Sequence, residues 1–278
     1  MIPQMPDPYT ISEFQKEEQR PISFGRAVHL SQAGELDGAV MNPNLNAKRI
    51  QDQYEAGSSA PGAEMVYFDD VLTESALTSL RRFCLESTVW FDVNQNGKRG
   101  SYVGAYMDMG FLPPILVGLA EELEASFPRI FKGHVLKGMW AYKYSSESDP
   151  TTDAEGIAIH ADPAAVNVNF WITEDDANLD RDSGGLVVYK VGAPETEESF
   201  DEFNVCKEVC RERLANTGYD NMTVPYKANR IVIFNSNLYH KTDKFRFKRG
   251  YTKRRINITL LFGFRKTAGQ SKTAIKLN

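Results

Sequence analysis

The sequence has 278 residues, of which 42% are hydrophobic and 25% are charged, and its formal net charge is −5. This composition is ordinary for a globular protein, and the length fits one large domain with extensions or two small ones. The chain contains no run of about 18 apolar residues, which argues against a membrane span. The first residues lack the basic and apolar regions of a signal peptide.

The three cysteines are Cys84, Cys206 and Cys210. An odd and sparse count argues against a disulfide framework and for a reducing compartment, so we expect a cytoplasmic protein. Cys206 and Cys210 lie four residues apart on a predicted helix. We interpret them as packed or solvent-facing thiols, which could bind a metal only together with other ligands.

Charge is unevenly distributed along the chain. From Lys241 onward there are twelve Lys and Arg residues against one acid, Asp243, which gives +11 and leaves −16 for the rest. A basic end could bind nucleic acid or an anionic small molecule, or could simply be solvated. Because no aromatic–basic module of a nucleic-acid binder accompanies it, we expect a small-molecule substrate, no nucleic acid and no membrane partner. A homo-oligomer stays an open alternative.

Residues 1–62 are polar and form a predicted N-terminal extension with helices near 11–19 and 45–55, which ends in a Gly/Ser/Pro linker. A short strand at Met65–Phe68 leads to a helix with Thr73 as its N-cap and apolar residues at helical spacing. Residues 94–97 predict a turn. A second helix at 115–127 has the buried stripe Leu116, Leu119, Leu123 and Phe127.

From about Gly138 the apolar pattern changes to the period of strands. The predicted strands are 139–144, 156–160, 165–172, 185–189, 230–234 and 256–262. Short strands after helices predict an α+β fold, with a jelly-roll, cupin-like core and the N-terminal helices packed on one sheet. The segment 195–215 interrupts the strands, and we interpret about 191–222 as a lid insertion, with a decorative surface helix as the alternative.

Two of the four histidines follow apolar, strand-like runs: His160 and His240. In an extended segment residues i and i+2 point to the same side, so His160 and Asp162 could bind one metal ion and His240 could join from another strand. Two imidazoles and one carboxylate form the facial triad typical of non-haem Fe(II) sites. His29 and His134 are expected to be structural or exposed.

A charged residue begins the last predicted strand, where Arg255, Asn257 and Thr259 share one face. An arginine inside a barrel is costly unless an anion meets it, and its planar fork fits a carboxylate. We therefore expect Arg255 to bind a carboxylate, with Arg254 and Arg249 as the alternatives.

These motifs together resemble the Fe(II)/2-oxoglutarate-dependent oxygenase superfamily, in particular its prolyl-hydroxylase-like and phytanoyl-hydroxylase-like members with a double-stranded β-helix core. The resemblance rests on His160-x-Asp162, the distal His240 and the Arg-x-Asn-x-Thr strand. It also rests on the Gly-Gly turn in 183–188 and on the segment 229–236, where Asn229 stands in place of the usual glycine. It covers roughly 139–263, within a domain that we place at 63–268, followed by a basic tail at 269–278.

The resemblance implies Fe(II), 2-oxoglutarate and O₂ as cofactors and cosubstrates. It implies His160, Asp162 and His240 as metal ligands, and Arg255, Asn257, Tyr144 and Asn169 as residues that bind 2-oxoglutarate. Trp171 is either a pocket wall or ordinary core. The implied reaction hydroxylates an unactivated C–H bond of a small molecule, an amino acid or a natural-product intermediate, and releases succinate and CO₂.

Four other readings stay open at this point. Two are a protein side-chain hydroxylase and a nucleic-acid demethylase of the same superfamily. The others are a non-catalytic cupin-like binding protein and a zinc hydrolase that uses the same three ligands.

Overall fold

The computed structural model describes residues 28–34, 38–56, 64–94, 102–145, 154, 156–195 and 200–265. The predicted helix near 11–19, most of the turn at 94–97 and the tail at 269–278 lie outside these residues. Among the described residues no helix is both long and apolar enough to cross a bilayer.

Two antiparallel sheets form the centre of the molecule. The larger has seven strands in the order β1-β8-β5-β10-β4-β3-β2, and the smaller has three in the order β7-β6-β9. The strands are β1 Met65–Phe68, β2 Asp92–Asn94, β3 Tyr102–Tyr106, β4 Leu136–Tyr144, β5 Val166–Trp171, β6 Leu186–Gly192, β7 Asn221–Val224, β8 Ile231–Asn235, β9 Leu238–Thr242 and β10 Ile256–Phe262. Together they form the predicted jelly-roll core.

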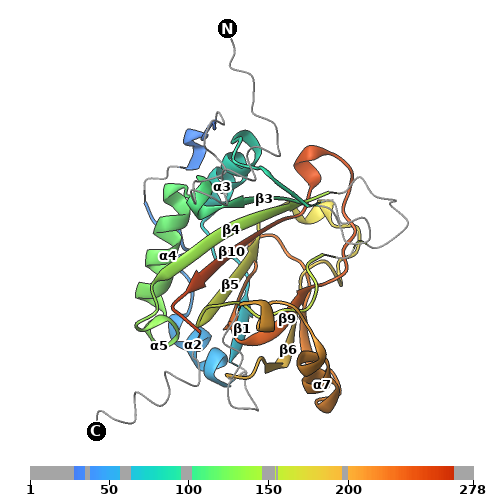
Figure 1. Cartoon of the computed structure of the whole chain (residues 1–278). Coiled ribbons are helices and arrows are strands. Elements are labelled where there is room, and N and C mark those ends of the chain that lie inside the picture. The colour runs from blue at the N-terminus through green and yellow to red at the C-terminus, as the bar shows by residue number, and fades with distance from the viewer. Residues whose placement is uncertain are drawn as a thin grey trace, which may run out of the picture.

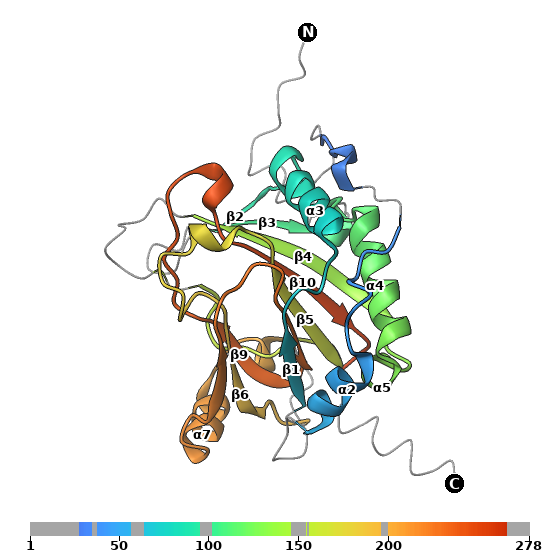
Figure 2. The same ribbon diagram turned by 180° about the vertical axis from the view of Figure 1, so that it is seen from behind.

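Helices cover the outer face of the larger sheet. Figures 1 and 2 show α3 and α4 on that side, whereas β6 and β9 lie on the other side with α7 beyond them. The helices are α2 Ala47–Ala56, α3 Glu74–Glu86, α4 Pro114–Ser126, α5 Pro128–Phe131, α6 Phe200–Phe203 and α7 Glu208–Asn216. The N-terminal helices therefore pack on one sheet, as the sequence predicts.

Local sequence explains where these helices begin and what they bury. The Thr73 hydroxyl accepts a hydrogen bond from the Ala76 N–H, so Thr73 is the N-cap of α3. Proline begins α4 at Pro114, where its missing N–H costs no hydrogen bond. The predicted stripe of the second helix is confirmed, since all four of its residues are buried in the core.

The alternation of side chains along two central strands separates two different environments. On β5 and β10, residues such as Val168, Phe170 and Ile258 point to the helices and join the main core. Their neighbours Asn167, Asn169, Asn257 and Thr259 point to the opposite face and are buried as well. The inner face of the larger sheet is therefore polar at its centre, which requires partners for each amide and hydroxyl.

Asn229 stands where the pattern that the sequence resembles has a glycine, and its backbone conformation explains why asparagine is tolerated. Its φ is 64°, in the left-handed region where glycine is usual and where asparagine is among the tolerated residues. Its side chain also hydrogen-bonds both the N–H and the C=O of Leu72 at 2.9 Å. Asparagine thus replaces glycine here and ties the β8 entry to the segment before α3.

Lys143 on β4 is buried beside the main core, and its pH dependence gives a first test of the fold. Its Nζ donates to the Cys84 carbonyl at 2.8 Å and to the Tyr251 hydroxyl at 2.9 Å. The ammonium also lies over the rings of Trp90 and Tyr251. Burial lowers the pKa of Lys143 from 10.5 to about 8.

We expect the stability of the protein to rise from pH 8 to pH 10.5, relative to that of Lys143→Met. Between these values the unfolded chain binds a proton at this lysine and the folded chain does not, so the equilibrium shifts toward the folded state as pH rises. At 1.36 kcal/mol per pKa unit the change amounts to roughly 3 kcal/mol at most. Urea unfolding of both proteins at pH 7, 8.5 and 9.5 measures the free energy of unfolding. If this free energy changed with pH equally in the two proteins, Lys143 would not titrate this way.

Candidate metal centre and cavity

Three ligand-type side chains meet between the two sheets. His160 and Asp162 lie on the segment before β5, and His240 lies in the middle of β9. An isolated bridge pairs the two histidines, with the His160 N–H donating to the His240 C=O at 3.0 Å and the reverse bond at 2.8 Å. Backbone pairing thus holds the two imidazoles side by side.

Two details of the sequence prediction are wrong here. Residues 156–160 are not a strand, because this segment touches β9 only through isolated hydrogen bonds, such as that of the Thr242 N–H to the Ile157 C=O. His240 does not end the strand 231–235 either. It lies in a separate strand of the smaller sheet, where the period of two points it inward with Leu238, while Tyr239 packs outward.

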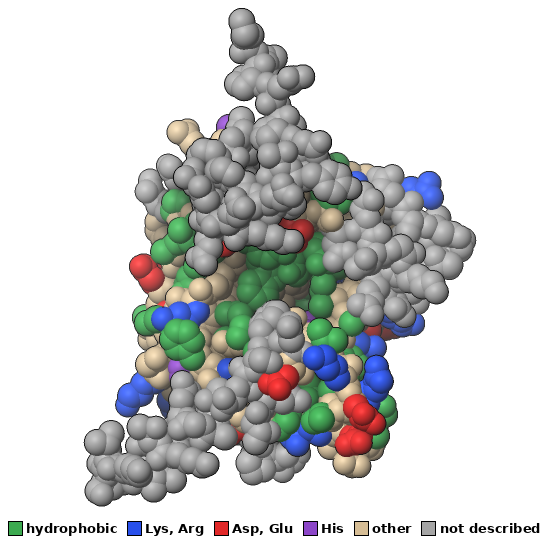
Figure 3. Space-filling model, in the orientation of Figure 1, with side chains coloured by type: hydrophobic (Ala, Val, Ile, Leu, Met, Phe, Trp, Pro, Cys, Tyr) green, Lys and Arg blue, Asp and Glu red, His purple; other side chains and the backbone are tan. Residues whose placement is uncertain are grey.

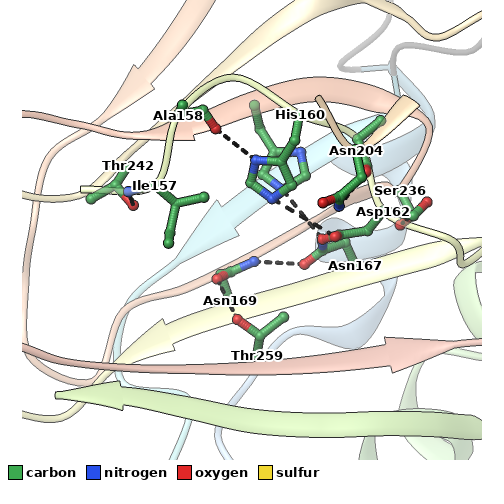
Figure 4. A network of polar contacts seen from close by, with 12 residues as sticks. Ile157, Ala158, His160, Asp162, Asn167, Asn169, Asn204, Ser236, Thr242 and Thr259 are labelled. Carbon is green, nitrogen blue, oxygen red and sulfur yellow. Dashed lines mark hydrogen bonds and ion pairs between the residues drawn. The ribbon is translucent and has the colours of Figure 1, made fainter. Parts of the chain in front are cut away.

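The triad has the spacing of a metal site. One ligand atom from each of the three residues lies within 4.8 Å of the others. His240 Nε2 is 3.3 Å from Asp162 Oδ2, and His160 Nε2 is 3.7 Å from Asp162 Oδ1. Figure 4 shows the His160 imidazole turned toward the Asp162 carboxylate. Two imidazoles and a carboxylate are the donor set typical of non-haem Fe(II) sites, and some catalytic zinc sites use the same donors.

The backbone fixes which nitrogen of each imidazole is free. His160 Nδ1 lies 2.8 Å from the Ala158 carbonyl, and His240 Nδ1 lies 2.9 Å from the Leu238 carbonyl. A carbonyl only accepts, so each Nδ1 carries the proton and each Nε2 offers its lone pair toward Asp162. Burial, assisted by the neighbouring His240, lowers the pKa of His160 to about 4. His160 is therefore neutral, and able to bind a metal, at neutral pH.

Asp162 is buried and held from several sides. Asn167 Nδ2 donates to its Oδ2 at 2.7 Å, and the Asp162 N–H donates to the Ser236 carbonyl at 3.2 Å. Burial alone would raise the pKa of the Asp162 carboxyl, but the two histidines and Asn167 lower it. The carboxylate is thus ionised, with Oδ1 left toward His160.

Replacing Asn167 by alanine is expected to weaken metal binding by roughly 10- to 100-fold, the usual effect of losing a residue that orients a ligand. Calorimetric titration with Co(II) or Ni(II) measures the affinity. Asn221→Ala, at an exposed asparagine on β7, is the matched control. Equal affinities for the two variants would mean that Asn167 does not orient Asp162.

A hydrogen-bonded ladder continues from Asn167 across the inner face. Asn169 Nδ2 donates to Asn167 Oδ1 at 2.6 Å, and the Thr259 hydroxyl donates to Asn169 Oδ1 at 2.9 Å. Asn257 Nδ2 donates to Asn169 Oδ1 and to Thr259 Oγ1. The register of β5 with β10, in which Asn169 is opposite Thr259, makes this ladder. Asn169 and Asn257 both line the cavity, where the sequence predicts a cosubstrate.

The triad lies on the wall of a cavity of about 740 Å³. Figure 3 shows the opening as a hollow with hydrophobic side chains at its centre. Five aromatic residues line one side: Tyr102, Tyr106, Trp140, Tyr142 and Tyr144. Such a volume, mostly apolar with a few polar groups, is typical of small-molecule sites.

Arg255 is buried, with 1% of its surface exposed, and is not among the residues that line the cavity. Its Nε and Nη2 donate to the carbonyls of Gly184 and Gly185, at 2.7 and 3.0 Å. Its Nη1 is buried with no hydrogen-bond partner among the described residues. Of the alternatives, Arg249 is exposed and Arg254 is half-buried. Arg255 is therefore the candidate whose side chain faces inward.

Aromatic rings enclose the Arg255 guanidinium. Its central carbon is 5.0 Å from the ring centre of Tyr144, 5.5 Å from that of Phe245 and 5.8 Å from that of Trp171. Trp171 is fully buried, and its Nε1 also has no partner among the described residues. Arg255 and Trp171 thus each have a buried donor without an acceptor among the described residues.

Cys206 and Cys210 form a disulfide, so the prediction of free thiols is wrong for this pair. The count of cysteines was the wrong criterion, because a spacing of four can bring two side chains together where a helix begins. Cys84 is free and buried, and burial raises the pKa of its thiol to about 12. His29 is exposed and His134 is half-buried, away from the triad, in agreement with the prediction for both.

A contact between the insertion and the candidate ligand segment could not be predicted from the sequence. The Ala161 N–H donates to the Phe203 carbonyl at 2.9 Å, and Asn204 Nδ2 donates to the Ala161 carbonyl at 3.3 Å. Ala161 is the residue between two of the candidate ligands. No local sequence signal marks this contact, which joins segments more than 40 residues apart.

No protein-family model matches this sequence, and no curated protein sequence matches it significantly. Solved structures do match. One is the non-haem alpha-ketoglutarate-dependent carbocyclase SnoK from nogalamycin biosynthesis, at 13% identity and a TM-score of 0.52 over 87% of this chain and 94% of that one.

Two further structures match with lower TM-scores. One is a prolyl hydroxylase from Trichoplax adhaerens, at 12% identity and a TM-score of 0.48 over 84% of this chain and 94% of that one. The other is HygX from Streptomyces hygroscopicus, at 13% identity and a TM-score of 0.48 over 76% of this chain and 86% of that one. The chain therefore has the fold of the alpha-ketoglutarate-dependent enzyme SnoK, with a His-Asp-His triad on the wall of its cavity.

Proposed function

We propose that this chain is an Fe(II)- and 2-oxoglutarate-dependent dioxygenase that hydroxylates a C–H bond of a small molecule. The observation that carries this proposal is the triad of His160, Asp162 and His240 on the wall of a large cavity between two sheets. The shared fold with SnoK supports it. When bound, such a centre couples the oxidation of 2-oxoglutarate to succinate and CO₂ with the oxidation of the substrate by O₂.

The chain's own residues would hold and orient the reactants. His160, Asp162 and His240 would hold the metal, and the cavity that they line would admit 2-oxoglutarate and O₂. Tyr144, Asn169 and Asn257 would contact 2-oxoglutarate, since all three line the cavity. Arg255 would pair with its distal carboxylate, because a buried guanidinium with a free N–H is stabilised by an anion.

The carboxylate of Asp162 completes the facial triad typical of non-haem Fe(II) oxygenases, which favours hydroxylation. The cavity is also larger than a single amino acid requires, which favours the natural-product alternative within the small-molecule class.

A screen of candidate substrates that reads succinate release tests the proposal. The wild-type protein with Fe(II) should consume 2-oxoglutarate faster in the presence of a true substrate, and His160→Ala should not. An anaerobic titration with Fe(II) and 2-oxoglutarate should produce a weak visible charge-transfer band.

Other outcomes of the same experiments identify the rival functions. A hydrolase would contain zinc and release no succinate, and a non-catalytic binding protein would give neither band nor turnover. Strongly salt-dependent binding of DNA or RNA would indicate a nucleic-acid demethylase, and turnover with peptides alone would indicate a protein side-chain hydroxylase.

We also propose that the insertion between β6 and β7 acts as a lid of the cavity. Asn204, Val205, Cys206 and Arg211 line the cavity from this side. Phe203, Cys210 and Leu214 anchor the insertion on the outer face of the smaller sheet. Its hydrogen bonds to Ala161 join it to the candidate ligand segment. Movement of the insertion would thus affect both substrate entry and the triad.

Reducing the Cys206–Cys210 disulfide is expected to speed proteolysis of the insertion several-fold, because the cross-link limits the open conformations from which a protease cuts. Mass spectrometry of fragments from limited proteolysis, with and without reductant, measures the effect. The double variant Cys206→Ala/Cys210→Ala is the control, since reductant should not change its cleavage rate. Equal rates for the oxidised and reduced wild-type protein would contradict the expectation.

A further inference from the structure

One wall of the cavity is unusually rich in aromatic side chains, and strand pairing explains why. On β3 and β4 the residues that face the cavity alternate with residues that face the helices. The register places Tyr102 opposite Tyr144, Gly104 opposite Tyr142, and Tyr106 opposite Trp140. Five of these six positions are therefore aromatic, and all five line the cavity.

The sixth position is Gly104, and the Tyr106 ring lies over it. A Cβ at this position would lie 3.1 Å from the Tyr106 ring, so the absence of a side chain lets that ring lie over the strand. Tyr142 is the centre of the cluster, with its ring centroid 4.4 Å from that of Tyr102, 6.1 Å from that of Tyr106 and 6.5 Å from that of Trp140.

Four members of the cluster are only half-buried, whereas Tyr144 is fully buried; the four are Tyr102, Tyr106, Trp140 and Tyr142. Adjacent rings in this cluster are tilted by 45° to 80°. They present both ring faces and ring edges to the cavity. An aromatic ligand can therefore pack in the two arrangements that aromatic pairs prefer, offset stacking and edge-to-face contact. An aromatic surface left partly open inside a cavity indicates a ligand that completes its packing.

The charges around the cavity argue against a cation as that ligand. Among the described lining residues the charged groups are Arg211 and the triad carboxylate Asp162. Asp92, which accepts a hydrogen bond from the Tyr106 hydroxyl at 2.5 Å, is not among the described residues that line the cavity. Apolar side chains also line the cavity, including Ile157, Ile159 and Val205. A neutral, flat and apolar ring fits between such surfaces.

We propose that the substrate carries an aromatic ring system, which binds against the wall formed by Tyr102, Tyr106, Trp140 and Tyr142. The inference deepens the proposed function, on which it rests for the identity of this ligand as the substrate. The wall lies in the same cavity as the triad, so a ring held there presents its substituents to the metal site. With about 740 Å³, the cavity accommodates a molecule of several rings together with a small dicarboxylate.

Two probes with the same carbon skeleton test the inference: 2-naphthol, which is flat and aromatic, and trans-decahydro-2-naphthol, which is saturated. Equilibrium dialysis against the metal-free full chain measures both affinities, so the result does not depend on iron chemistry. Each aromatic pair contributes about two- to tenfold in affinity, and we expect 2-naphthol to bind at least about fivefold more tightly.

Variants of the central ring locate the effect. Tyr142→Leu should abolish the preference for 2-naphthol, and Tyr142→Phe should retain it. Tyr67→Leu, at an exposed tyrosine on β1, is the matched control and should behave as the wild type. Equal binding of the two probes, no measurable binding of either, tighter binding of tetramethylammonium, or an unchanged preference in Tyr142→Leu would each overturn the inference. Failure of the proposed function would instead appear as the absence of succinate, with the naphthol preference intact.

Discussion

Replacing Asp162 by alanine is expected to lower metal affinity by more than about 100-fold and to abolish turnover of 2-oxoglutarate. The carboxylate is the one anionic ligand of the triad, and the Nε2 atoms of His160 and His240 lie 3.7 and 3.3 Å from its oxygens. Since losing a residue that merely orients a ligand costs 10- to 100-fold, loss of the ligand itself should exceed that range. Calorimetric titration with Co(II), followed by a succinate assay with Fe(II), measures both effects.

Asp182→Ala is the matched control for Asp162→Ala. Asp182 is an exposed carboxylate before β6 and lines no part of the cavity. Its removal should leave affinity and turnover within about twofold of wild type, as expected for a surface change. Circular dichroism should show both variants folded. A folded Asp162→Ala protein that still bound Co(II) like the wild type would exclude the triad as the metal site.

The sequence predicts the larger sheet well because its central strands combine two strong signals. In β10, apolar Ile256, Ile258 and Leu260 alternate with polar residues, and both faces of the strand are buried. The helix at α3 was predictable from one capping residue and its apolar spacing. Such local signals agree with the tertiary structure wherever one face of an element packs against the core.

The smaller sheet was harder to predict for physical reasons. Only three residues of β9 are buried, and Lys241 and Thr242 at its end are polar, so its pattern is too short to indicate a strand. Conversely, Ile157 and Ile159 alternate as in a strand, although the backbone of their segment pairs with β9 only through an isolated bridge. Gly156 packs directly against Thr242, where a Cβ would lie only 2.5 Å from that side chain. Close packing, rather than a ladder of hydrogen bonds, holds this segment in place.

The candidate ligands could be predicted from the sequence, and the residues that orient them could not. The spacing of His160 and Asp162 lets both side chains point to one side, and the distal His240 together with the Arg255 strand makes this otherwise weak pattern informative. The bond from Asn167 to Asp162 and the bonds from Phe203 and Asn204 to Ala161 depend on how separate segments pack. One signal was available: Asn167 and Asn169 alternate within a strand that is otherwise apolar, and buried amides need partners.

Replacing Arg255 by leucine is expected to weaken binding of 2-oxoglutarate by roughly 10- to 100-fold, because a hydrogen bond to a charged group contributes about 1.5–3 kcal/mol. The variant should also be less stable, since the carbonyls of Gly184 and Gly185 would lose their buried donor. These two effects must be separated. Anaerobic titration of 2-oxoglutarate into the Co(II)-loaded protein measures the first, and urea unfolding of the metal-free protein measures the second.

Arg255 lies against Tyr144, which lines the cavity, but Arg255 itself is not among the lining residues. The test therefore distinguishes a structural role from binding of the cosubstrate. If Arg255 only ties the Gly184–Gly185 turn to the barrel, then Arg255→Leu will lose stability while 2-oxoglutarate and Co(II) bind as in the wild type. If it also binds the cosubstrate, 2-oxoglutarate affinity will fall and Co(II) affinity will not. Arg255→Lys should recover part of that affinity, since a lysine keeps the charge but not the planar fork. Arg249→Leu, at an exposed arginine, should change neither quantity, and a loss of 2-oxoglutarate affinity there would transfer the role to Arg249.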